Sequence, residues 1–369
     1  MKSLKLALVV CLLAGGAFAL GPQASQAEEN HGAVFVMTNA ASNNQVIAYS
    51  RQQDGSLQRT GEFSTGGNGS GGAVDPLSSQ GSLTLSADHR LLFAVNAGSG
   101  TMSSFEVEGS SLRLVDAVSS GGSSPTALTH FGNLLYVLNA GGNGNLSGFR
   151  VNPHGRLQRI ENSTRNLSGP STSPTSLVFS PNGQFLAVTE HATNNIDIFR
   201  VHPNGTLSDA VTNSVPGSQP FAALFAPNGA LIVAGTANTI SSFNVQWNQT
   251  IQTITNALPT EGMATCWDII TPNGAVVYAI NANSSNIAGF NIAHNGSLTP
   301  VDGTIVGSNP AGSANLDTAI SADGKFVYTL NAGTGSIGVF AVQSDGSLTS
   351  DGQLGGLAAS SGLNGLAAY

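Results

Sequence analysis

Charged and aromatic side chains are scarce in this sequence of 369 residues: charged residues make up 9% and aromatic residues 6%. Lysine occurs only at Lys2, Lys5 and Lys325, and the formal net charge is −8. Because the chain is acidic and forms no basic stripe, nucleic acid and anionic membrane surfaces are excluded as partners. With so few aromatic residues, the core has to come from Val, Leu, Ile and Ala.

The residue patterns of metal and cofactor sites are also missing. Cysteine occurs only at Cys11 and Cys266, and loss of an N-terminal segment with Cys11 would leave one free thiol and no disulfide. The sequence holds no pair of Cys or His at ligand spacing, no Gly-x-Ser-x-Gly elbow and no phosphate-binding loop. We therefore expect neither a metal nor a cofactor.

Residues 1–27 have the organisation of a secretory signal peptide. Two lysines precede an apolar run at residues 6–13, and the small residues at 17–19 and 25–27 suit signal peptidase. The apolar run is too short to remain in a bilayer as a transmembrane helix. We expect cleavage of this segment, no transmembrane anchor, and a mature protein that is secreted or periplasmic.

Glycine and proline are present in quantity, with 46 and 15 residues, and they punctuate a repeated pattern. Its clearest copy, Phe326 to Leu348, reads FVYTLNAGTGSIGVFAVQSDGSL. An alternating run is followed by an Asn-Ala turn, a second apolar run, an Asp-Gly turn and the start of a third strand. Further copies begin at Val34, Leu91, Leu134, Phe185, Leu231 and Val276. A fourth strand precedes most of these meanders and ends in its own Pro-Asn-Gly or Asp-Gly turn.

Seven such units predict an all-β protein, a seven-bladed β-propeller with four antiparallel strands per blade. One aromatic residue per unit marks the repeat, at intervals close to the ~40–50 residues of a blade: Tyr49, Phe105, Phe149, Phe199, Phe243, Phe290 and Phe340. We expect residues 28–369 to form one propeller domain in which residues 64–79 are a flexible Gly/Ser-rich loop. The C-terminal strand at 362–369 should join the N-terminal blade at 33–39 and so close the ring and hide two edges.

Several of these motifs resemble the seven-bladed lactonase family. They are the Asn-Ala turn, the Pro-Asn-Gly turns, and Thr265-Cys266-Trp267 followed by Pro272-Asn273-Gly274. The family includes a propeller 6-phosphogluconolactonase and the fungal 3-carboxy-cis,cis-muconate cyclases, and the chain most resembles exported bacterial members of unassigned activity. The resemblance implies a lactonase (a hydrolase) or a cycloisomerase. The meanders also look like those of surface-layer YVTN-type propellers.

The resemblance implies a site at one end of the channel. Enzymatic members carry Pro-Arg-His at the start of the fourth inner strand, where this chain has Pro174-Thr175-Ser176. An earlier Pro-His-Ala segment of the family matches Pro125-Thr126-Ala127, so that a His is replaced there as well. Glu190 falls where the family has an acid. Cationic groups are thus replaced by hydroxyls, and one acid is kept.

The repeat places candidate residues at the same end without reference to the family. Asn ends the second strand in five copies, which is typical of a turn former, whereas blade four has Glu190-His191 there. We predict Glu190 and His191 as catalytic, with Glu190 as proton acceptor and His191 as proton donor or orienting group. The predicted substrate-binding residues are Thr175, Ser176, Phe221, Trp267, Asp268 and Asp317. The alternatives are a surface ion pair for Glu190-His191 and a blade-interface filler for Trp267.

Two classes of function remain open at this point. The first is an exported enzyme that hydrolyses or forms a small lactone, as the family resemblance implies. The second is a non-catalytic exported or cell-surface propeller that binds a small molecule, a glycan or a partner protein, because propellers host many activities. In either class we expect a small polar organic ligand or lactone as partner, and a monomeric protein.

Overall fold

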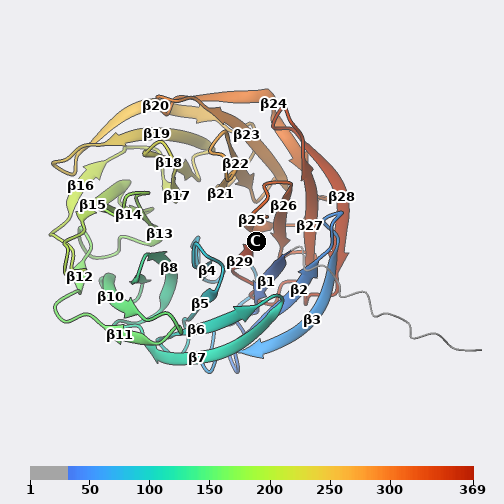
Figure 1. The fold of residues 1–369 in the computed structure, drawn as a ribbon. Coiled ribbons are helices and arrows are strands. Elements are labelled where there is room, and N and C mark those ends of the chain that lie inside the picture. The colour runs from blue at the N-terminus through green and yellow to red at the C-terminus, as the bar shows by residue number, and fades with distance from the viewer. Residues whose placement is uncertain (1–31) are drawn as a thin grey trace, which may run out of the picture.

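The computed structural model describes residues 32–369, which form a ring of seven antiparallel sheets around a central channel (Figure 1). The expected signal peptide lies outside the described residues. No helix occurs within residues 32–369, so none there is long and apolar enough to cross a membrane. The predicted seven-bladed β-propeller is confirmed.

Each blade has one strand at the channel and three further out. Blade one contains β29 (Leu366–Ala368), β1 (Ala33–Met37), β2 (Gln45–Arg51) and β3 (Leu57–Ser64). Blade two contains β4 (Leu83–Leu85), β5 (Leu91–Asn96), β6 (Thr101–Glu108) and β7 (Ser111–Ser119). Blade three contains β8 (Pro125–Phe131), β9 (Leu134–Asn139), β10 (Asn145–Val151) and an outer edge divided into β11 (Leu157–Arg159) and β12 (Arg165–Asn166).

The remaining four blades follow the chain without interruption. Blade four contains β13 (Pro174–Phe179), β14 (Phe185–Glu190), β15 (Asn195–Arg200) and β16 (Val211–Ser214). Blade five contains β17 (Pro220–Phe225), β18 (Ala230–Gly235), β19 (Thr239–Val245) and β20 (Ile251–Pro259). Blade six contains β21 (Thr265–Ile270), β22 (Val276–Asn281), β23 (Asn286–Ile292) and β24 (Leu298–Ser308). Blade seven contains β25 (Asn315–Ile320), β26 (Phe326–Asn331), β27 (Ser336–Val342) and β28 (Leu348–Gly355).

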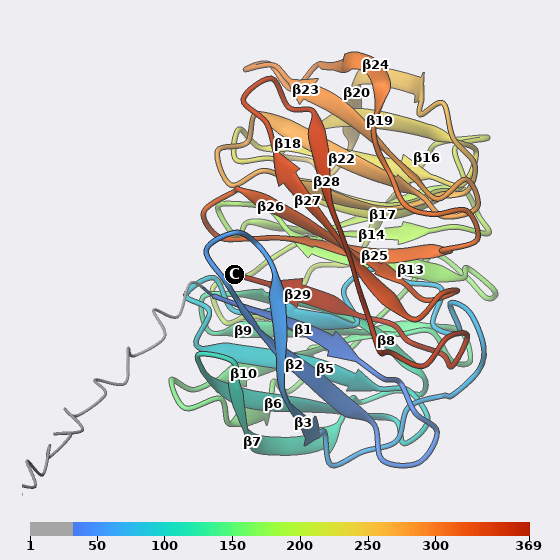
Figure 2. The same ribbon diagram turned by 90° about the vertical axis from the view of Figure 1, so that its right-hand side faces the viewer.

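Ring closure by the C-terminal strand is also confirmed. β29 pairs with β1 so that Val34 faces Ala368 and Val36 faces Leu366. The C-terminus therefore lies beside the N-terminal strand, at the centre of the ring (Figures 1 and 2). A strand from each end of the described chain completes blade one, so neither leaves an unpaired inner edge.

The core lies between the blades, where apolar side chains of neighbouring sheets meet. The aromatic residue that marks each repeat is at most 4% exposed in every blade. Tyrosines of three second strands add a polar link: the hydroxyl groups of Tyr136, Tyr278 and Tyr328 donate to backbone oxygens of the next blade at 2.7–3.1 Å. These links fix how far apart neighbouring blades lie, and with them the shape of the channel.

Candidate functional site

Bulges at the start of the inner strands form one end of the channel, which we call the channel mouth. In five blades the pairing of the first two strands shifts by one residue at the same place, which leaves one residue of the inner strand unpaired. A bulge re-aims the side chain that it carries and is common next to functional sites. The bulged residues are Thr126, Thr175, Phe221, Cys266 and Asp317, all buried.

The mouth is covered by residues 75–80, which we call the cap segment. It belongs to the long connection between β3 and β4. Ser79 is 1% exposed, its hydroxyl donates to the backbone oxygen of Thr126 at 2.8 Å, and its own carbonyl accepts from Nε1 of Trp267 at 3.1 Å. The segment thus connects blade three to blade six across the mouth.

Gln80 makes the closest set of contacts in the cap segment. Its backbone N–H donates to the carbonyl of Thr175 at 2.9 Å. Its side chain forms two hydrogen bonds with the backbone of Asp268, donating from Nε2 to O at 3.2 Å and accepting from N at 3.0 Å. Through Ser79, the end of the loop predicted at residues 64–79 is also bonded to the ring. The mobility of this loop stays a prediction.

Three of the predicted site residues form a row of rings beneath this cover. The ring of His191 lies 6.2 Å from that of Phe221, and Phe221 lies 5.2 Å from Trp267, both in edge-on arrangements. Nε2 of His191 is hydrogen-bonded to the hydroxyl of Thr236 at 2.8 Å, and partial burial lowers the pKa of His191. Trp267 is fully buried, so its ring packs inside the protein in this structure.

Buried carboxyl groups surround the mouth. Burial raises the pKa of Asp268 to about 7, and its two carboxyl oxygens have no hydrogen-bond partner among the described residues. Burial likewise raises the pKa of Asp75, in the cap segment, to about 7. Groups that titrate near neutral pH in a concave site are candidates for acid–base roles.

Asp317 combines a raised pKa with access to the channel. It occupies a bulge in β25 with a positive φ of 45°, and its carboxyl oxygens accept from the backbone N–H groups of Thr318 and Leu366 at 2.9 Å each. Burial raises its pKa to about 7 despite these bonds. Asp317 is also one of the residues that line the cavity described below.

The channel holds a cavity of about 320 Å³. Asp317, Ser176 and Gln80 line it at the covered end, and further along its wall is aliphatic: Leu85, Val178, Leu224, Ile269, Ile320 and Ala368. These aliphatic side chains are partly exposed, so the cavity is accessible from the end opposite the cap segment. Among the lining residues only Asp317 is titratable. The backbone of Ser176 pairs with that of Thr189, but its hydroxyl makes no hydrogen bond to another described residue.

Glu190 lies elsewhere, at the end of β14. It is fully buried, and its carboxylate accepts from the backbone N–H and hydroxyl of Ser168, from the hydroxyl of Thr193 at 2.6 Å and from Nδ2 of Asn195 at 3.4 Å. Burial acts to raise the pKa of Glu190, but the hydrogen bonds from Ser168 and Thr193 outweigh it and lower the pKa. No hydrogen bond or ion pair joins Glu190 to His191 in residues 32–369.

Asn occupies the same position in four other blades and makes equivalent contacts there, whereas Asn39 of blade one lies one residue further along, because Thr38 takes that position. Asn139 bonds to Asn145, and Asn281 to Asn286, each linking the end of the second strand to the start of the third. The sequence suggested a turn-forming role for these residues. They instead form buried side-chain links between two strands, and Glu190 with Asn195 is the version in blade four.

A second acid, Asp197 on β15, lies beside Glu190. Burial, followed by the nearby charge of Glu190, raises the pKa of Asp197 to about 7. As the pH falls, Asp197 is therefore the first of the two to take up a proton, and Glu190 keeps its negative charge. Neither residue lines the channel cavity.

The structure thus divides the predicted site. It brings Ser176 and Asp317 to the cavity, and it places Phe221, Trp267 and Asp268 in the mouth beneath the cap segment. The hydroxyl of Thr175 bonds to that of Thr189 at 2.9 Å and donates to the carbonyl of Phe221 at 2.7 Å. No group of three or more His, Cys, Asp or Glu side chains that could hold a metal ion occurs in the described chain.

Sequence reasoning missed the cap segment, above all Gln80. The sequence does signal it, since residues 64–82 make the longest interval between repeats, which is enough chain to cross the ring. Its contacts with blades three, four and six join residues up to 188 positions apart. No local pattern reports such distant contacts.

A family model described as lactonase, 7-bladed beta-propeller, matches residues 19–168 and 132–355. No curated protein matches the chain. Among solved structures, a protein assigned as a 6-phosphogluconolactonase from Bacteroides fragilis has 20% identity and a TM-score of 0.66 over 92% of this chain and 98% of its own.

Two further structures show the same fold. A periplasmic gluconolactonase from Pseudomonas aeruginosa has 19% identity and a TM-score of 0.67, covering 91% of this chain and 98% of its own. A protein from Lactobacillus plantarum has 16% identity and a TM-score of 0.71, with coverage of 91% and 98%. These similarities extend along nearly the whole of each relative.

Proposed function

Because the chain belongs to the lactonase family of seven-bladed β-propellers, we propose that it is an exported enzyme that hydrolyses a small uncharged lactone in its channel. The observation that carries this proposal is that Asp317 and Ser176 both line the covered end of a cavity whose wall further along is mainly aliphatic. A carboxyl that titrates near pH 7 is matched to general acid–base work. The free hydroxyl supplies a hydrogen-bond donor.

The reaction uses Asp317 first as a base and then as an acid, and it uses Ser176 as a hydrogen-bond donor. The Asp317 carboxylate takes a proton from a water molecule as the water oxygen attacks the lactone carbonyl carbon. The hydroxyl of Ser176 donates a hydrogen bond to the carbonyl oxygen as negative charge develops there. The ring C–O bond then breaks, Asp317 returns the proton to the ring oxygen, and the product is a hydroxy acid.

The lining of the cavity defines the substrate class. No Lys, Arg or His lines it, and its one titratable group is an acid. A phosphorylated lactone or an unsaturated dicarboxylate would enter this space without a cationic partner, which is costly in a desolvated site. We therefore propose neither 6-phosphogluconolactone hydrolysis nor carboxymuconate cyclisation. The aliphatic wall suits a lactone with an apolar side.

This proposal changes the roles given to the two residues first predicted as catalytic. The carboxylate of Glu190 accepts hydrogen bonds from Ser168, Thr193 and Asn195, which lie within or beside blade four. His191 is held by Thr236 and does not line the cavity. We assign Glu190 to the link between β14 and β15, and His191 to the ring row under the cap segment.

The test is the hydrolysis of δ-valerolactone and glucono-1,5-lactone, followed by proton release and corrected for the spontaneous rate. We expect Asp317→Asn to lower kcat about 10²–10⁴-fold and Ser176→Ala to lower it less. Wild-type activity should rise with pH through about 7, because the base form of Asp317 is required. Asp268→Asn is the matched control, since this second buried carboxyl of raised pKa does not line the cavity.

A second candidate function is binding without turnover. It is favoured by the covered mouth and by the bonds that Asp317 already accepts from two backbone N–H groups. This function predicts no hydrolysis above the spontaneous rate and a rise in melting temperature when either lactone is added. That pair of results would favour binding over catalysis.

Export is part of the proposal and is supported by the signal-peptide pattern of residues 1–27. A mature chain that begins between Leu20 and Glu28 would contain a single thiol, because Cys266 would then be its only cysteine. N-terminal sequencing of the exported protein tests this. A protein that still begins at Met1 would contradict it.

A further inference from the structure

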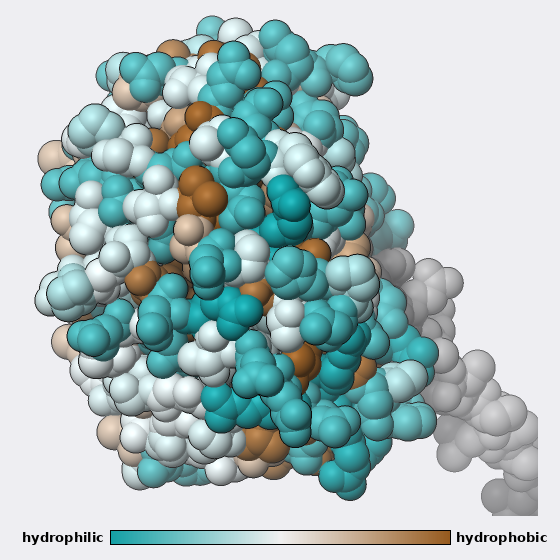
Figure 3. All heavy atoms as spheres, turned by 90° about the vertical axis from the view of Figure 1, so that its left-hand side faces the viewer, coloured by the Kyte–Doolittle hydropathy of each residue, from teal (hydrophilic) through white to brown (hydrophobic). Residues whose placement is uncertain are grey.

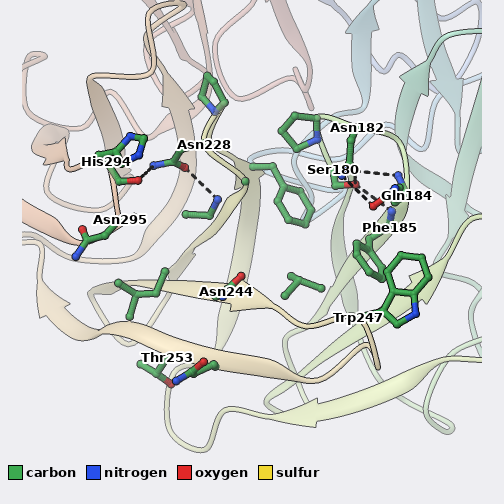
Figure 4. Close-up of a pocket in the computed structure, with 18 residues that line it drawn as sticks. Ser180, Asn182, Gln184, Phe185, Asn228, Asn244, Trp247, Thr253, His294 and Asn295 are labelled. Carbon is green, nitrogen blue, oxygen red and sulfur yellow. Dashed lines mark hydrogen bonds between the residues drawn. The ribbon is translucent and has the colours of Figure 1, made fainter.

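A second pocket, separate from the channel, opens between the turns of blades four, five and six. It has a volume of about 780 Å³, within the ~300–1,000 Å³ usual for small-molecule sites. One wall is the turn between β13 and β14, with Ser180 and Asn182, and another is the β23–β24 turn, with His294 and Asn295 (Figure 4). The turns that form it lie at the end of the ring opposite the cap segment.

The pocket contains a tryptophan that is both exposed and held in place. Trp247 is 64% exposed, the highest value among the large apolar side chains that the structure describes as exposed. The guanidinium of Arg200 lies 4.2 Å from its ring centroid and donates to its backbone oxygen. The ring of Phe185 meets it edge-on at 6.1 Å. Exposing this apolar ring to water costs free energy, and Arg200 and Phe185 hold the exposed ring in one orientation.

Such exposure is unusual on this protein. The face shown in Figure 3 is largely hydrophilic, with small scattered apolar patches. The large apolar side chains that are exposed elsewhere in residues 32–369 are Val74, Leu114, Phe131 and Met263. An ordered, exposed aromatic ring in a concave site is a feature of binding surfaces rather than of plain surface.

Uncharged polar groups face the same space. The side chains of Asn244, Gln252 and Thr253 are exposed and make no hydrogen bond to another described residue. The Nε2 group of Gln184 and the Nδ2 group of Asn295 are also free to donate, because only their oxygens are used within the protein. Donors and acceptors are therefore spread around the ring of Trp247.

The charges around the pocket select among ligand classes. His294 is the one titratable residue among those that line the pocket, so no lining residue carries a fixed charge. Arg200 stands against Trp247 and would repel a ligand cation from this ring. The combination of a flat apolar face with neutral amides and hydroxyls matches a ligand that has an apolar C–H face and many hydroxyl groups.

We propose that this pocket binds a neutral saccharide, with one sugar ring stacked on Trp247 and its hydroxyls bonded to Asn244, Gln252 and neighbouring amides. This site is independent of the channel and of the lactone chemistry proposed there. It would attach the exported propeller to a polysaccharide or a glycan.

Tryptophan fluorescence tests the proposal directly. The chain has two tryptophans, and Trp267 is fully buried, so a change in emission on adding sugar reports Trp247. The probes are cellohexaose, maltohexaose, mannohexaose and chitohexaose at up to millimolar concentration. We expect at least one to bind, Trp247→Ala to weaken that binding about tenfold or more, and Trp247→Phe to retain part of it.

Calorimetry with the same probe provides a readout that does not need the tryptophan. Gln252→Ala should weaken binding, whereas Met263→Ala, which removes another exposed apolar side chain outside this pocket, should not. The proposal is overturned if none of the four sugars binds, if Trp247→Ala binds as the wild type does, or if tetramethylammonium or polygalacturonate binds in preference to the neutral sugars.

Discussion

At the scale of single residues, the hydrogen bonds of Glu190 are the reason that we assign it to the link between β14 and β15. The four donor groups around its carboxylate come from Ser168, Thr193 and Asn195. All lie within or beside blade four, and the carboxylate has no exposed surface. Its environment stabilises a fixed negative charge rather than one that gains and loses a proton.

We predict that Glu190→Gln destabilises the protein without removing activity. The new amide N–H₂ would face donors instead of acceptors, and an unsatisfied buried group of this kind costs about 1–3 kcal/mol. Urea unfolding measures the loss. Glu161→Gln, at an exposed glutamate, is the control and should change the free energy of unfolding by less than about 0.5 kcal/mol. Unchanged stability with loss of turnover would restore Glu190 as a catalytic base.

The buried acid Asp268 should make stability depend on pH. Its pKa is about 7 in the folded protein against an ordinary value of 3.8, so between these values the folded state holds a proton that the unfolded state has lost. The contribution of Asp268 to the free energy of unfolding is therefore fully present below about pH 4 and declines as the pH rises to about 7. At higher pH the folded protein carries a buried charge.

We predict that Asp268→Asn raises stability relative to the wild type at pH 8 but not at pH 4. The difference should be on the order of a few kcal/mol, since one pKa unit corresponds to about 1.4 kcal/mol. Urea unfolding at pH 4, 6 and 8 measures it, and the other buried acids cancel because both proteins contain them. An effect of equal size at pH 4 and pH 8 would show that Asp268 is not protonated preferentially in the folded state.

At the scale of elements, the cap segment determines which end of the channel a ligand can use. It places Gln80 against the backbone of β21 and Ser79 against Trp267 and β8. The inner strands, in contrast, present partly exposed aliphatic side chains toward the other end. A ligand that reaches Asp317 therefore passes the aliphatic wall first.

We predict that Gln80→Ala loosens the cap segment. The substitution removes two hydrogen bonds to Asp268, each with a net worth of about 0.5–1.5 kcal/mol. Hydrogen exchange of the Asp268 amide should become about tenfold faster or more. Gln58→Ala, at an exposed position of β3, is the control. Unchanged exchange would mean that the segment is held by other contacts.

The strands were predictable from the sequence and the cap segment was not. Runs such as Phe326–Asn331 alternate with the period of a strand and end at Asn or Gly turns, so their conformation is encoded locally. The cap segment has no period, and its position depends on partners such as Thr126 and Trp267 in other blades. For the same reason the sequence could predict that Ser176 and Asp317 lie at one end of the channel, but it could not show that the carboxylate of Glu190 is hydrogen-bonded within and beside blade four.

At the scale of the whole molecule, one seam holds the ring together. β29 pairs with β1, and the guanidinium of Arg51 in blade one reaches Asp323 in blade seven at 3.2 Å. The hydroxyl of Tyr369 donates to the backbone of Gly109 in blade two at 2.9 Å. The seam thus connects the last, first and second blades.

We predict that deletion of residues 362–369 lowers the cooperativity of unfolding and promotes aggregation. The deletion exposes the edge of β1, which could then pair with another molecule, and it removes the Leu366 bond to Asp317. Calorimetry and light scattering measure the two effects. A truncated protein that stays soluble and melts as the full chain does would contradict closure by β29.

We propose that the channel of this propeller turns over an uncharged lactone, with Asp317 as its acid–base group. The most direct measurement compares kcat/KM for glucono-1,5-lactone and δ-valerolactone with kcat/KM for 6-phosphoglucono-1,5-lactone, using the exported protein and Asp317→Asn. We expect the wild type to have a higher kcat/KM for at least one uncharged lactone than for the phosphorylated lactone, and we expect Asp317→Asn to lower kcat/KM for the uncharged lactone about 10²–10⁴-fold. Preference for the phosphorylated lactone, or full activity in Asp317→Asn, would contradict this proposal.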